Sequence, residues 1–200
     1  MGRQLLITSP TLDVVEPRIG GPALIGGIVN WPVSARGNPL ILVASLPNSF
    51  ISNATGLRLA PDLYTSVFSY YSEVDYFLDE ITYHGTREEL ECLRRGGTKV
   101  LQHRPGSCVA QSVGIPPHTL ELGEFCSDDN DCGSRIGAAP NLLQDEFLGL
   151  QDMSFVLQLR SSDFPEKFNG IFGILDALGY LYLRQMCDSP ESGLFFIQTT

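Results

Sequence analysis

Residues 18–24 read Arg-Ile-Gly-Gly-Pro-Ala-Leu, and the apolar run Leu40-Ile41-Leu42-Val43-Ala44 follows about twenty residues later. A similar arrangement comes later in the chain, where residues 135–142 read Arg-Ile-Gly-Ala-Ala-Pro-Asn-Leu and precede the run Phe155-Val156-Leu157-Gln158-Leu159. In each case a Gly/Pro turn enters a variable loop and then a strand-like run. The repetition predicts two copies of one unit, at about residues 14–110 and 130–200.

The rest of the chain is also rich in strand signals. A further β-rich segment follows each run, at Tyr64 to Tyr71 and at Tyr180 to Leu183. Six other short segments are aromatic or β-branched and bounded by Gly or Pro: Gln4 to Thr8, Asp79 to His84, Thr98 to His103, Thr119 to Leu122, Gly170 to Leu175 and Leu194 to Gln198. We therefore expect an α+β, strand-rich fold, in which two duplicated half-domains pack into one compact body, residues 1–200, with few helices.

Helical patterns are few. The clearest helix runs from Arg87 to Arg95, because Thr86 and Glu89 have the spacing of a capping box and Gly96-Gly97 form a stop. Residues 72–78 have apolar side chains at helical spacing, but their aromatic content also suits a strand, and the sequence does not decide between the two.

The charge balance restricts the class of partner. The chain carries 13 basic and 23 acidic residues, a formal net charge of −10, and such a field repels phosphate backbones and anionic lipid headgroups. The acids are gathered: five lie between Arg58 and Arg87, and five between Arg104 and Arg135, with no Lys or Arg in either stretch. Clustered acids speed association with a basic protein. We therefore expect no direct nucleic-acid binding and no membrane binding.

The basic residues form one local run, which consists of Arg87, Arg94, Arg95, Lys99 and Arg104. A run of this kind on a helix is typical of a solvated face. We interpret it in that way rather than as a nucleic-acid site.

Motifs of catalysis and nucleotide binding are missing. There is no Gly-x-Ser-x-Gly elbow, and His84, His103 and His118 lie in separate segments without a partner pattern. Neither Gly-x-x-x-x-Gly-Lys nor Gly-x-Gly-x-x-Gly occurs, so Gly20-Gly21-Pro22 is interpreted as a tight turn with positive φ. We expect no nucleotide cofactor and no catalytic residues.

The segment Cys126-Ser-Asp-Asp-Asn-Asp-Cys132 contains residue types that bind metals. Two thiolates with His118 or His103 could close a zinc site, but five residues between cysteines is not the usual spacing. The same loop fails as an EF-hand, since Cys132 stands where Gly is required. We interpret it as a solvated acidic loop and expect no metal.

The cysteines and the N-terminus indicate a compartment. Five cysteines without a Cys-x-x-Cys pair fit reduced thiols better than a disulfide framework. The apolar stretch Leu5 to Ile7 is too short for a secretory signal, and no segment approaches the length that spans a bilayer. These features predict a cytoplasmic protein.

Trp31 is the single tryptophan, and it precedes Pro32 at the end of the Gly-rich turn. An aromatic ring there commonly anchors the loop to the core, and the alternative is an interface hot spot. We favour the core anchor.

The run Arg18-Ile19-Gly20-Gly21-Pro22, the pair Trp31-Pro32 and the stretch Pro39 to Val43 together resemble the opening of the YwqG-like family of uncharacterised bacterial proteins. Residues 133–137 and 155–159 resemble the later repeat of that family. The chain departs from the family pattern at Ala138-Ala139, where a second Gly is expected, and at Val43-Ala44-Ser45, which replaces the usual Ala-Gln pair. The resemblance covers about half the chain and implies a duplicated α+β fold with no established catalytic residues.

The resemblance also implies a function, because members of such families recur as immunity proteins in bacterial toxin systems. Nuclease toxins are typically basic since they hold DNA or RNA, so an acidic cytoplasmic protein would block one well. We expect a non-enzymatic immunity protein that binds a cognate protein toxin, a nuclease, and occludes its active site or substrate-binding surface. The candidate contacts are the clustered acids: Asp75, Asp79, Glu80, Glu121, Glu124, Asp128, Asp129 and Asp131.

One alternative stays open. Duplicated halves often leave a cleft between them, and an enzyme or small-ligand-binding protein with Cys or His chemistry there would have the same sequence features.

Overall fold

A computed structural model describes residues 2–26, 30–109, 114–126, 133–144, 147–184 and 193–199. The described chain is strand-rich, and its strands form one large antiparallel sheet. In sequence order the strands are β1 (Arg3–Pro10), β2 (Arg18–Ile19), β3 (Ala23–Gly26), β4 (Ile41–Pro47), β5 (Tyr64–Ser69), β6 (Thr98–Val109), β7 (His118–Phe125), β8 (Arg135–Ile136), β9 (Ser154–Arg160), β10 (Leu178–Leu183) and β11 (Gly193–Gln198). Across the sheet their order is β11-β10-β9-β8-β1-β7-β2-β4-β5-β6-β3.

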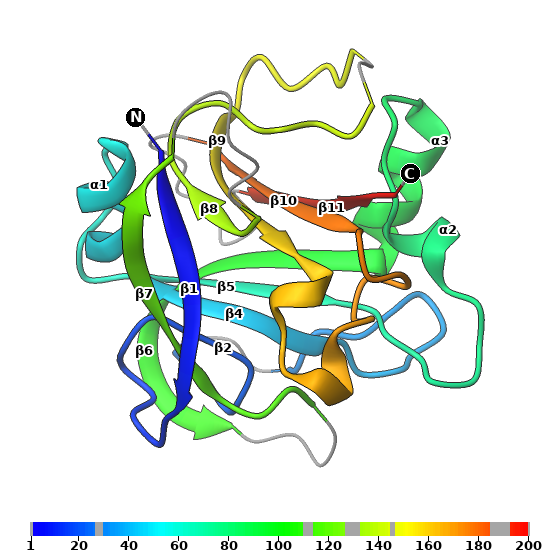
Figure 1. Cartoon of the computed structure of the whole chain (residues 1–200). Helices are drawn as coiled ribbons and strands as arrows, with labels where there is room; N and C mark the ends of the chain where they lie inside the picture. Colours follow the sequence, from blue (N-terminus) through cyan, green and yellow to red (C-terminus); the bar gives the residue numbers. More distant parts are fainter. Residues whose placement is uncertain are drawn as a thin grey trace.

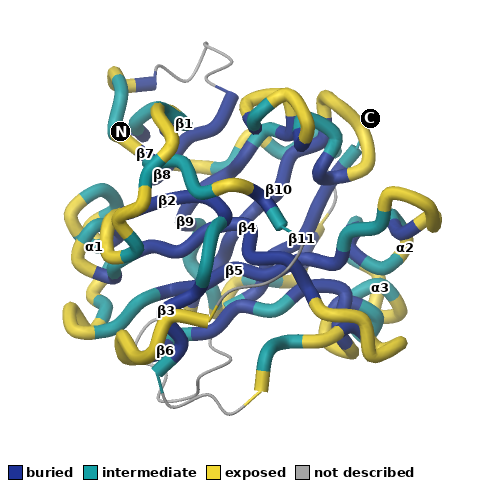
Figure 2. The backbone as a smooth tube through the Cα atoms, turned by 90° about the horizontal axis from the view of Figure 1, so that it is seen from below, coloured by how far each residue is buried: buried dark blue, intermediate teal, exposed yellow. Residues whose placement is uncertain are grey.

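The helices are short and lie at the periphery of the sheet (Figure 1). They are α1 (Asn48–Thr55), α2 (Leu78–Ile81) and α3 (Arg87–Cys92), followed by a π-helical turn over Leu93–Gly97 and two 3-10 turns, Ser161–Asp163 and Glu166–Phe168. Figure 2 shows that exposed backbone is concentrated in these helices and in the loops, whereas the strands of the interior are buried. No helix of the described residues is long and apolar enough to cross a membrane.

The order of the strands follows the same pattern on both sides of the central β1–β7 pair. On one side β2, β4, β5 and β6 follow one another, and on the other side β8, β9, β10 and β11 do. The first strand of each half pairs with the other half: β1 lies against β8, and β7 lies against β2. Neither half of the chain therefore completes its own part of the sheet.

The registers agree as well as the order. Ala44 of β4 lies opposite Val67, and Leu157 of β9 lies opposite Leu181. Both strands then carry a one-residue bulge, between Leu42 and Ala44 in β4 and between Phe155 and Leu157 in β9. We call two residues matched when they hold the same register position, counted from the bulge, one in strands β4, β5 and β6 and the other in strands β9, β10 and β11.

The glycine-containing turns also behave alike. The Gly20 amide donates to the Val43 carbonyl at 3.1 Å, and the Gly137 amide donates to the Val156 carbonyl at 2.8 Å. The carbonyl of each bulge residue thus accepts from the turn that precedes its strand. Gly20 has φ +58°, and a Cβ there would lie 2.3 Å from the Ile115 carbonyl oxygen, so this turn requires glycine.

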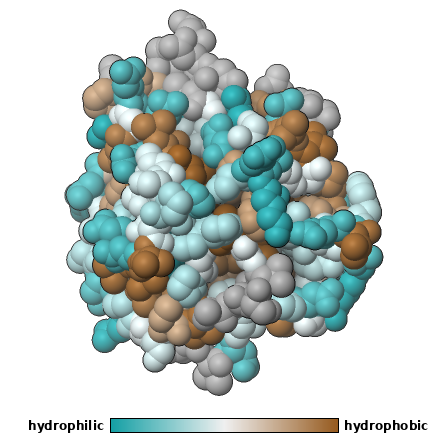
Figure 3. Space-filling view, turned by 60° about the horizontal axis from the view of Figure 1, so that its bottom comes forward, coloured by the Kyte–Doolittle hydropathy of each residue, from teal (hydrophilic) through white to brown (hydrophobic). Residues whose placement is uncertain are grey.

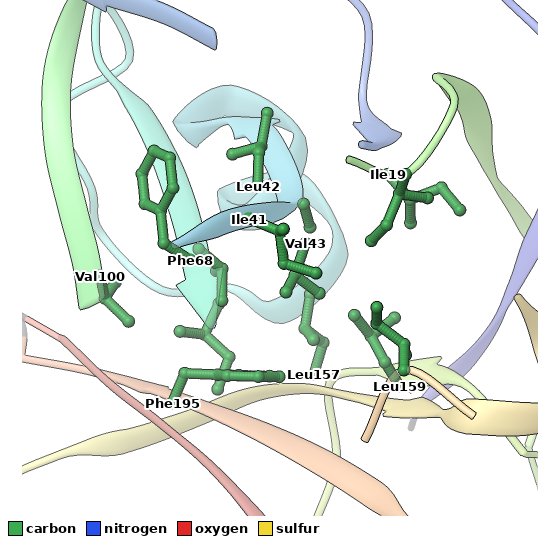
Figure 4. Packing of buried hydrophobic residues seen from close by; sticks show 14 of the residues in the cluster. Ile19, Ile41, Leu42, Val43, Phe68, Val100, Leu157, Leu159 and Phe195 are labelled. Atoms are coloured by element: carbon green, nitrogen blue, oxygen red, sulfur yellow. The ribbon is translucent and has the colours of Figure 1, made fainter. Parts of the chain in front are cut away.

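The sheet curls so that its two halves enclose one core. Figure 4 shows Ile41, Val43 and Phe68 from one half near Leu157 and Phe195 from the other. The first residues of β6 and β11 meet where the sheet closes, because the Thr98 hydroxyl donates to the Phe195 carbonyl at 2.5 Å. A second cluster lies on β10 and β11 and includes Tyr180, Tyr182 and Phe196, over which Tyr83, Leu93 and Leu148 pack.

Most of the expected strands are confirmed. Residues 4–8, 40–44, 64–71, 98–103, 119–122, 155–159, 180–183 and 194–198 lie in or overlap β1, β4, β5, β6, β7, β9, β10 and β11. The strand-rich class with few helices is confirmed with them.

Two expected strands are wrong. Residues 79–84 begin within α2, where Asp79 and Glu80 occupy the first turn, a favourable place for negative charge. Residues 170–175 form consecutive turns rather than a strand, and the Gly173 amide donates to the Gly170 carbonyl at 2.8 Å. Ile171 and Phe172 are nevertheless buried, so they are apolar because this loop packs against the core.

The helix predicted over residues 87–95 is confirmed as far as Cys92. The Glu89 amide donates to the Thr86 hydroxyl at 3.3 Å and the Glu89 carboxylate accepts from the Thr86 amide at 3.2 Å, which completes the capping box. Residues 72–77 are not helical, and α2 begins at Leu78. Helix α1 had no sequence prediction; it ends at Gly56, whose φ is +78°.

Candidate functional site

The acids expected to form one surface fall into separate groups. Asp75, Asp79 and Glu80 lie in or just before α2, whereas Glu121 and Glu124 lie on β7. Figures 1 and 2 place α2 and β7 on opposite sides of the molecule. Asp128, Asp129 and Asp131 lie outside the described residues. The described acids therefore do not gather into a single patch.

The acids near α2 differ in how far their charge is compensated. The Glu80 side chain is mostly buried, and its carboxylate lies 3.0 Å from the guanidinium of Arg36. Asp75 accepts from the Ser72 hydroxyl at 3.4 Å, and Asp79 accepts from the Tyr76 hydroxyl at 3.1 Å. Asp75 and Asp79 are both exposed, and the hydrogen bond to Asp79 raises the pKa of the Tyr76 hydroxyl.

Apolar side chains alternate with these acids. Val74 is 90% exposed and Tyr76 is 68% exposed, and both stand between or beside Glu73, Asp75 and Asp79. We call residues 73–79 the acidic-apolar segment. On the face seen in Figure 3, by contrast, hydrophobic residues occur in several separate patches among hydrophilic ones. The acidic-apolar segment thus combines charge and exposed apolar surface in one short stretch.

Strand β7, which carries Glu121 and Glu124, also contacts an arginine of the neighbouring strand. Glu121 accepts from the Thr8 hydroxyl at 3.1 Å. On the neighbouring strand Arg3 donates to the Gly123 carbonyl at 2.7 Å, and its guanidinium lies 5.3 Å from the centre of the Phe125 ring. The arginine weakens the local negative field of β7.

The residues of the first Gly/Pro turn and the Trp31-Pro32 pair make contacts within the fold. Gly20 and Gly21 both have positive φ, and Pro22 follows them. The Trp31 indole donates to the Leu40 carbonyl at 2.7 Å and meets the Phe68 ring edge-on at 5.2 Å, while the Pro32 carbonyl accepts from the Leu40 amide at 2.9 Å. These contacts support the core-anchor interpretation of Trp31 over the hot spot.

Ser66 and His103 lie side by side in the sheet, and both are buried. The Ser66 hydroxyl lies 2.8 Å from His103 Nε2, but Ser66 is 0% and His103 4% exposed. Burial lowers the pKa of His103. Because the Arg104 carbonyl can only accept, Nδ1 of His103 donates to it at 2.9 Å and Nε2 accepts from Ser66. His84 is bonded to Glu89 within the capping box of α3.

Sequence reasoning missed one feature, a cavity of about 350 Å³ where β6 meets β11. Arg94, Lys99 and Arg184 line it together with apolar residues. Two of these cations belong to the basic run that was interpreted as a solvated helix face. The basic run is visible in the sequence, but no sequence pattern indicates that it lies near Arg184 in the fold. Among the described residues no cluster of His, Cys, Asp and Glu could hold a metal.

Comparison with known proteins identifies no relative: no protein-family model matches the chain, and no curated protein matches it.

Proposed function

We propose that the chain is an immunity-type binding protein that docks on a basic protein toxin through the acidic-apolar segment and covers the toxin's substrate-binding surface. The observation that carries the proposal is the exposure of Val74 and Tyr76 beside carboxylates that form no ion pair with the arginines that the structure describes. Tyrosine is among the residues that contribute most to binding energy in interfaces, and flanking charges steer the encounter with a partner of opposite charge.

The charge of the partner follows from its own substrate. A nuclease must neutralise phosphates with Lys and Arg, so its substrate-binding surface is basic. Asp75 and Asp79 would meet that surface, and the net charge of −10 adds long-range attraction. Asp128, Asp129 and Asp131 remain predicted contacts, and Glu121 and Glu124 are placed on the far side of the molecule from this surface.

Charge reversal of two acids near α2, compared with charge reversal of two acids on β7, tests the proposal. The toxin candidate is the basic product of a neighbouring gene, measured against the whole chain by calorimetry at low and high salt. We expect Asp75→Lys/Asp79→Lys to weaken toxin binding at least tenfold at low salt. The same variant should no longer restore the growth of cells that produce the toxin. Glu121→Lys/Glu124→Lys changes the net charge equally and is expected to retain both. Equal loss in the two variants, or loss in neither, would overturn the docking surface.

We also propose that the two halves of the chain are copies of one duplicated unit and that the resemblance to the YwqG-like family reflects common descent. The agreement of strand order, register and bulge position supports a duplication. The units would then run from β1 to β6 and from β7 to β11, with their first strands exchanged. Sequences of relatives test this, because matched positions such as Val43 and Val156 should show the same residue preferences.

A further inference from the structure

Two segments that are far apart in the sequence lie side by side at α2. One is the acidic-apolar segment, and the other is residues 170–176, which we call the turn segment. Gly173 packs directly on Leu78, the first residue of α2, since a Cβ at position 173 would lie 2.9 Å from Leu78 Cγ. Just before the turn segment, the centre of the Phe168 ring lies 6.4 Å from that of Tyr71. The acidic-apolar segment is therefore one part of a larger surface.

Buried aromatic rings hold both segments in place. In the acidic-apolar segment, Phe77 is 7% exposed and meets the ring of Tyr71 edge-on at 5.6 Å. In the turn segment, Phe172 is fully buried and meets the ring of Phe164 edge-on at 5.4 Å. A partner that docks here therefore meets a surface that is already anchored to the core, which reduces the entropy cost of association.

Each segment exposes two apolar side chains. Val74 and Tyr76 are 90% and 68% exposed, and Ile174 and Leu175 are 37% and 52% exposed. Tyr76 lies two positions before, and Ile174 one position after, the residues through which the two segments touch. Exposed apolar residues that occur singly are common in proteins, whereas a group of them marks an interaction site.

The charged residues that accompany these side chains are mostly acidic. The exposed charged residues at positions 73–79 and 166–176 are five acids and one base: Glu73, Asp75, Asp79, Glu166, Asp176 and Lys167. Arg36 also lies beside α2, where its guanidinium is paired with the Glu80 carboxylate at 3.0 Å. The chain as a whole has a formal net charge of −10. A partner that covers this surface therefore needs apolar side chains together with Lys or Arg.

We propose that the acidic-apolar segment and the turn segment form one docking surface for a basic amphipathic helix of the partner protein. Such a helix presents a stripe of apolar side chains with charged residues beside it, which complements exposed apolar residues accompanied by acids. Burial of Ile174 and Leu175 adds affinity that salt does not screen, whereas the acids govern the rate and the salt dependence of association. The inference rests on the proposed docking through the acidic-apolar segment, and it adds the turn segment and the kind of partner element.

Two synthetic peptides test the kind of partner element. One is a helical peptide of leucine and lysine with its leucines in a single stripe, and the other has the same composition in a scrambled order without a stripe. Each is titrated into the whole labelled chain while the amide NMR shifts are followed. We expect the striped peptide to bind saturably, to shift residues 73–79 and 170–176, and to bind at least tenfold tighter than the scrambled one. Equal affinity for the two peptides, shifts confined to other residues, or no saturable binding would overturn the proposal.

Two variants with unchanged charge test the turn segment. Ile174→Ser/Leu175→Ser should weaken binding of the striped peptide at least fivefold at both low and high salt. The control is Leu12→Ser/Val15→Ser, which changes two side chains that are 96% and 48% exposed between β1 and β2 and should leave binding within twofold. Urea denaturation establishes that each variant folds. Equal binding by folded forms of the two variants would exclude the turn segment from the surface, and the shifts of the wild type decide the matter if a variant does not fold.

The toxin experiment separates this inference from the proposed function. If Asp75→Lys/Asp79→Lys weakens binding of the toxin candidate but Ile174→Ser/Leu175→Ser does not, the proposed function holds and the turn segment lies outside the interface. If the striped peptide binds at both segments but the toxin candidate does not bind, the docking surface holds and the proposed toxin is wrong.

Discussion

Two sets of three buried polar side chains occupy matched positions in the sheet, and they are bonded in different ways. Ser45, Ser66 and His103 lie on β4, β5 and β6; Gln158, Tyr180 and Gln198 lie on β9, β10 and β11. All six are at most 4% exposed. Ser45 and Ser66 are short, and the first set bonds mainly within the sheet, with Ser66 Oγ 3.3 Å from Ser45 Oγ and 2.8 Å from His103 Nε2.

The second set reaches beyond the sheet. Gln158 donates to the Gly133 carbonyl at 2.7 Å and accepts from the Asn141 amide at 3.0 Å. Tyr180 donates to the Asn141 carbonyl at 2.7 Å, and Gln198 accepts from the Leu143 amide at 3.1 Å. These bonds hold residues 141–143 over the second apolar cluster. The longer side chains therefore couple the sheet to a covering layer, and the shorter ones do not.

Among the substitutions in the two sets, Gln158→Ala should reduce the free energy of unfolding most. It removes the hydrogen bonds from Gln158 to the Gly133 carbonyl and from the Asn141 amide to Gln158, and it opens a void at a side chain that is 1% exposed. We expect a loss of about 3 kcal/mol in the free energy of unfolding, measured by urea denaturation. Ser45→Ala at the matched position should cost about 1 kcal/mol or less. Similar losses in the two variants would show that the covering layer adds nothing.

Tyr180→Phe should have the next largest effect. The hydroxyl is buried and donates to the Asn141 carbonyl, and burial raises its pKa so that it stays protonated. Loss of this bond should cost about 1.5 kcal/mol in urea denaturation. Tyr182→Phe is the control, because the Tyr182 hydroxyl has no hydrogen-bond partner in the part of the chain that is described and burial alone raises its pKa to about 12. A larger loss in Tyr182→Phe would contradict the assigned role of Tyr180.

The sequence predicts the strands of these sets better than their bonding. The run 40–44, and the run 155–159 apart from Gln158, are apolar because the curled sheet buries both of their faces, and this pattern is visible in sequence. The matched bulges at Val43 and Val156 are not visible, since a bulge depends on the partner strand. Local propensity also misjudged residues 79–84, where acidic residues at a helix start outweighed the aromatic and β-branched neighbours.

The candidate site was predictable only in part. The acids near α2 are adjacent in sequence, so their exposure as one segment could be anticipated. That Glu121 and Glu124 lie on the opposite side follows from the sheet's closure, which no local pattern encodes. The cavity has the same origin, because Arg94 and Arg184 meet only when β6 reaches β11.

His103→Gln should remove a pH dependence that only the first set has. Burial lowers the pKa of His103, so below the unfolded pKa of about 6.5 the unfolded chain binds a proton that the folded chain does not. Wild-type stability should fall as the pH decreases through that value, by up to about 1.4 kcal/mol per pH unit. Glutamine, the matched residue at position 198, cannot titrate.

Unfolding free energies of the wild type and His103→Gln are compared at pH 7.5 and 5.5, and titration of the other groups cancels in the difference. The wild type should lose more stability than the variant on acidification. A slope that is the same in both proteins would mean that His103 is protonated in the folded state, contrary to its bonding.

Ser66→Ala should give the smallest change in the free energy of unfolding. It also tests whether the side chains of the first set depend on one another. Nε2 of His103 loses the hydroxyl that donates to it, and at pH 7.5 we expect about 1 kcal/mol of destabilisation. Removing both partners leaves no unsatisfied acceptor, so Ser66→Ala in the His103→Gln background should cost less than in the wild type. Equal costs in the two backgrounds would mean that the hydroxyl and the imidazole act independently. The first set would then be a group of separate polar residues, and the contrast with the second set would rest on Gln158, Tyr180 and Gln198 alone.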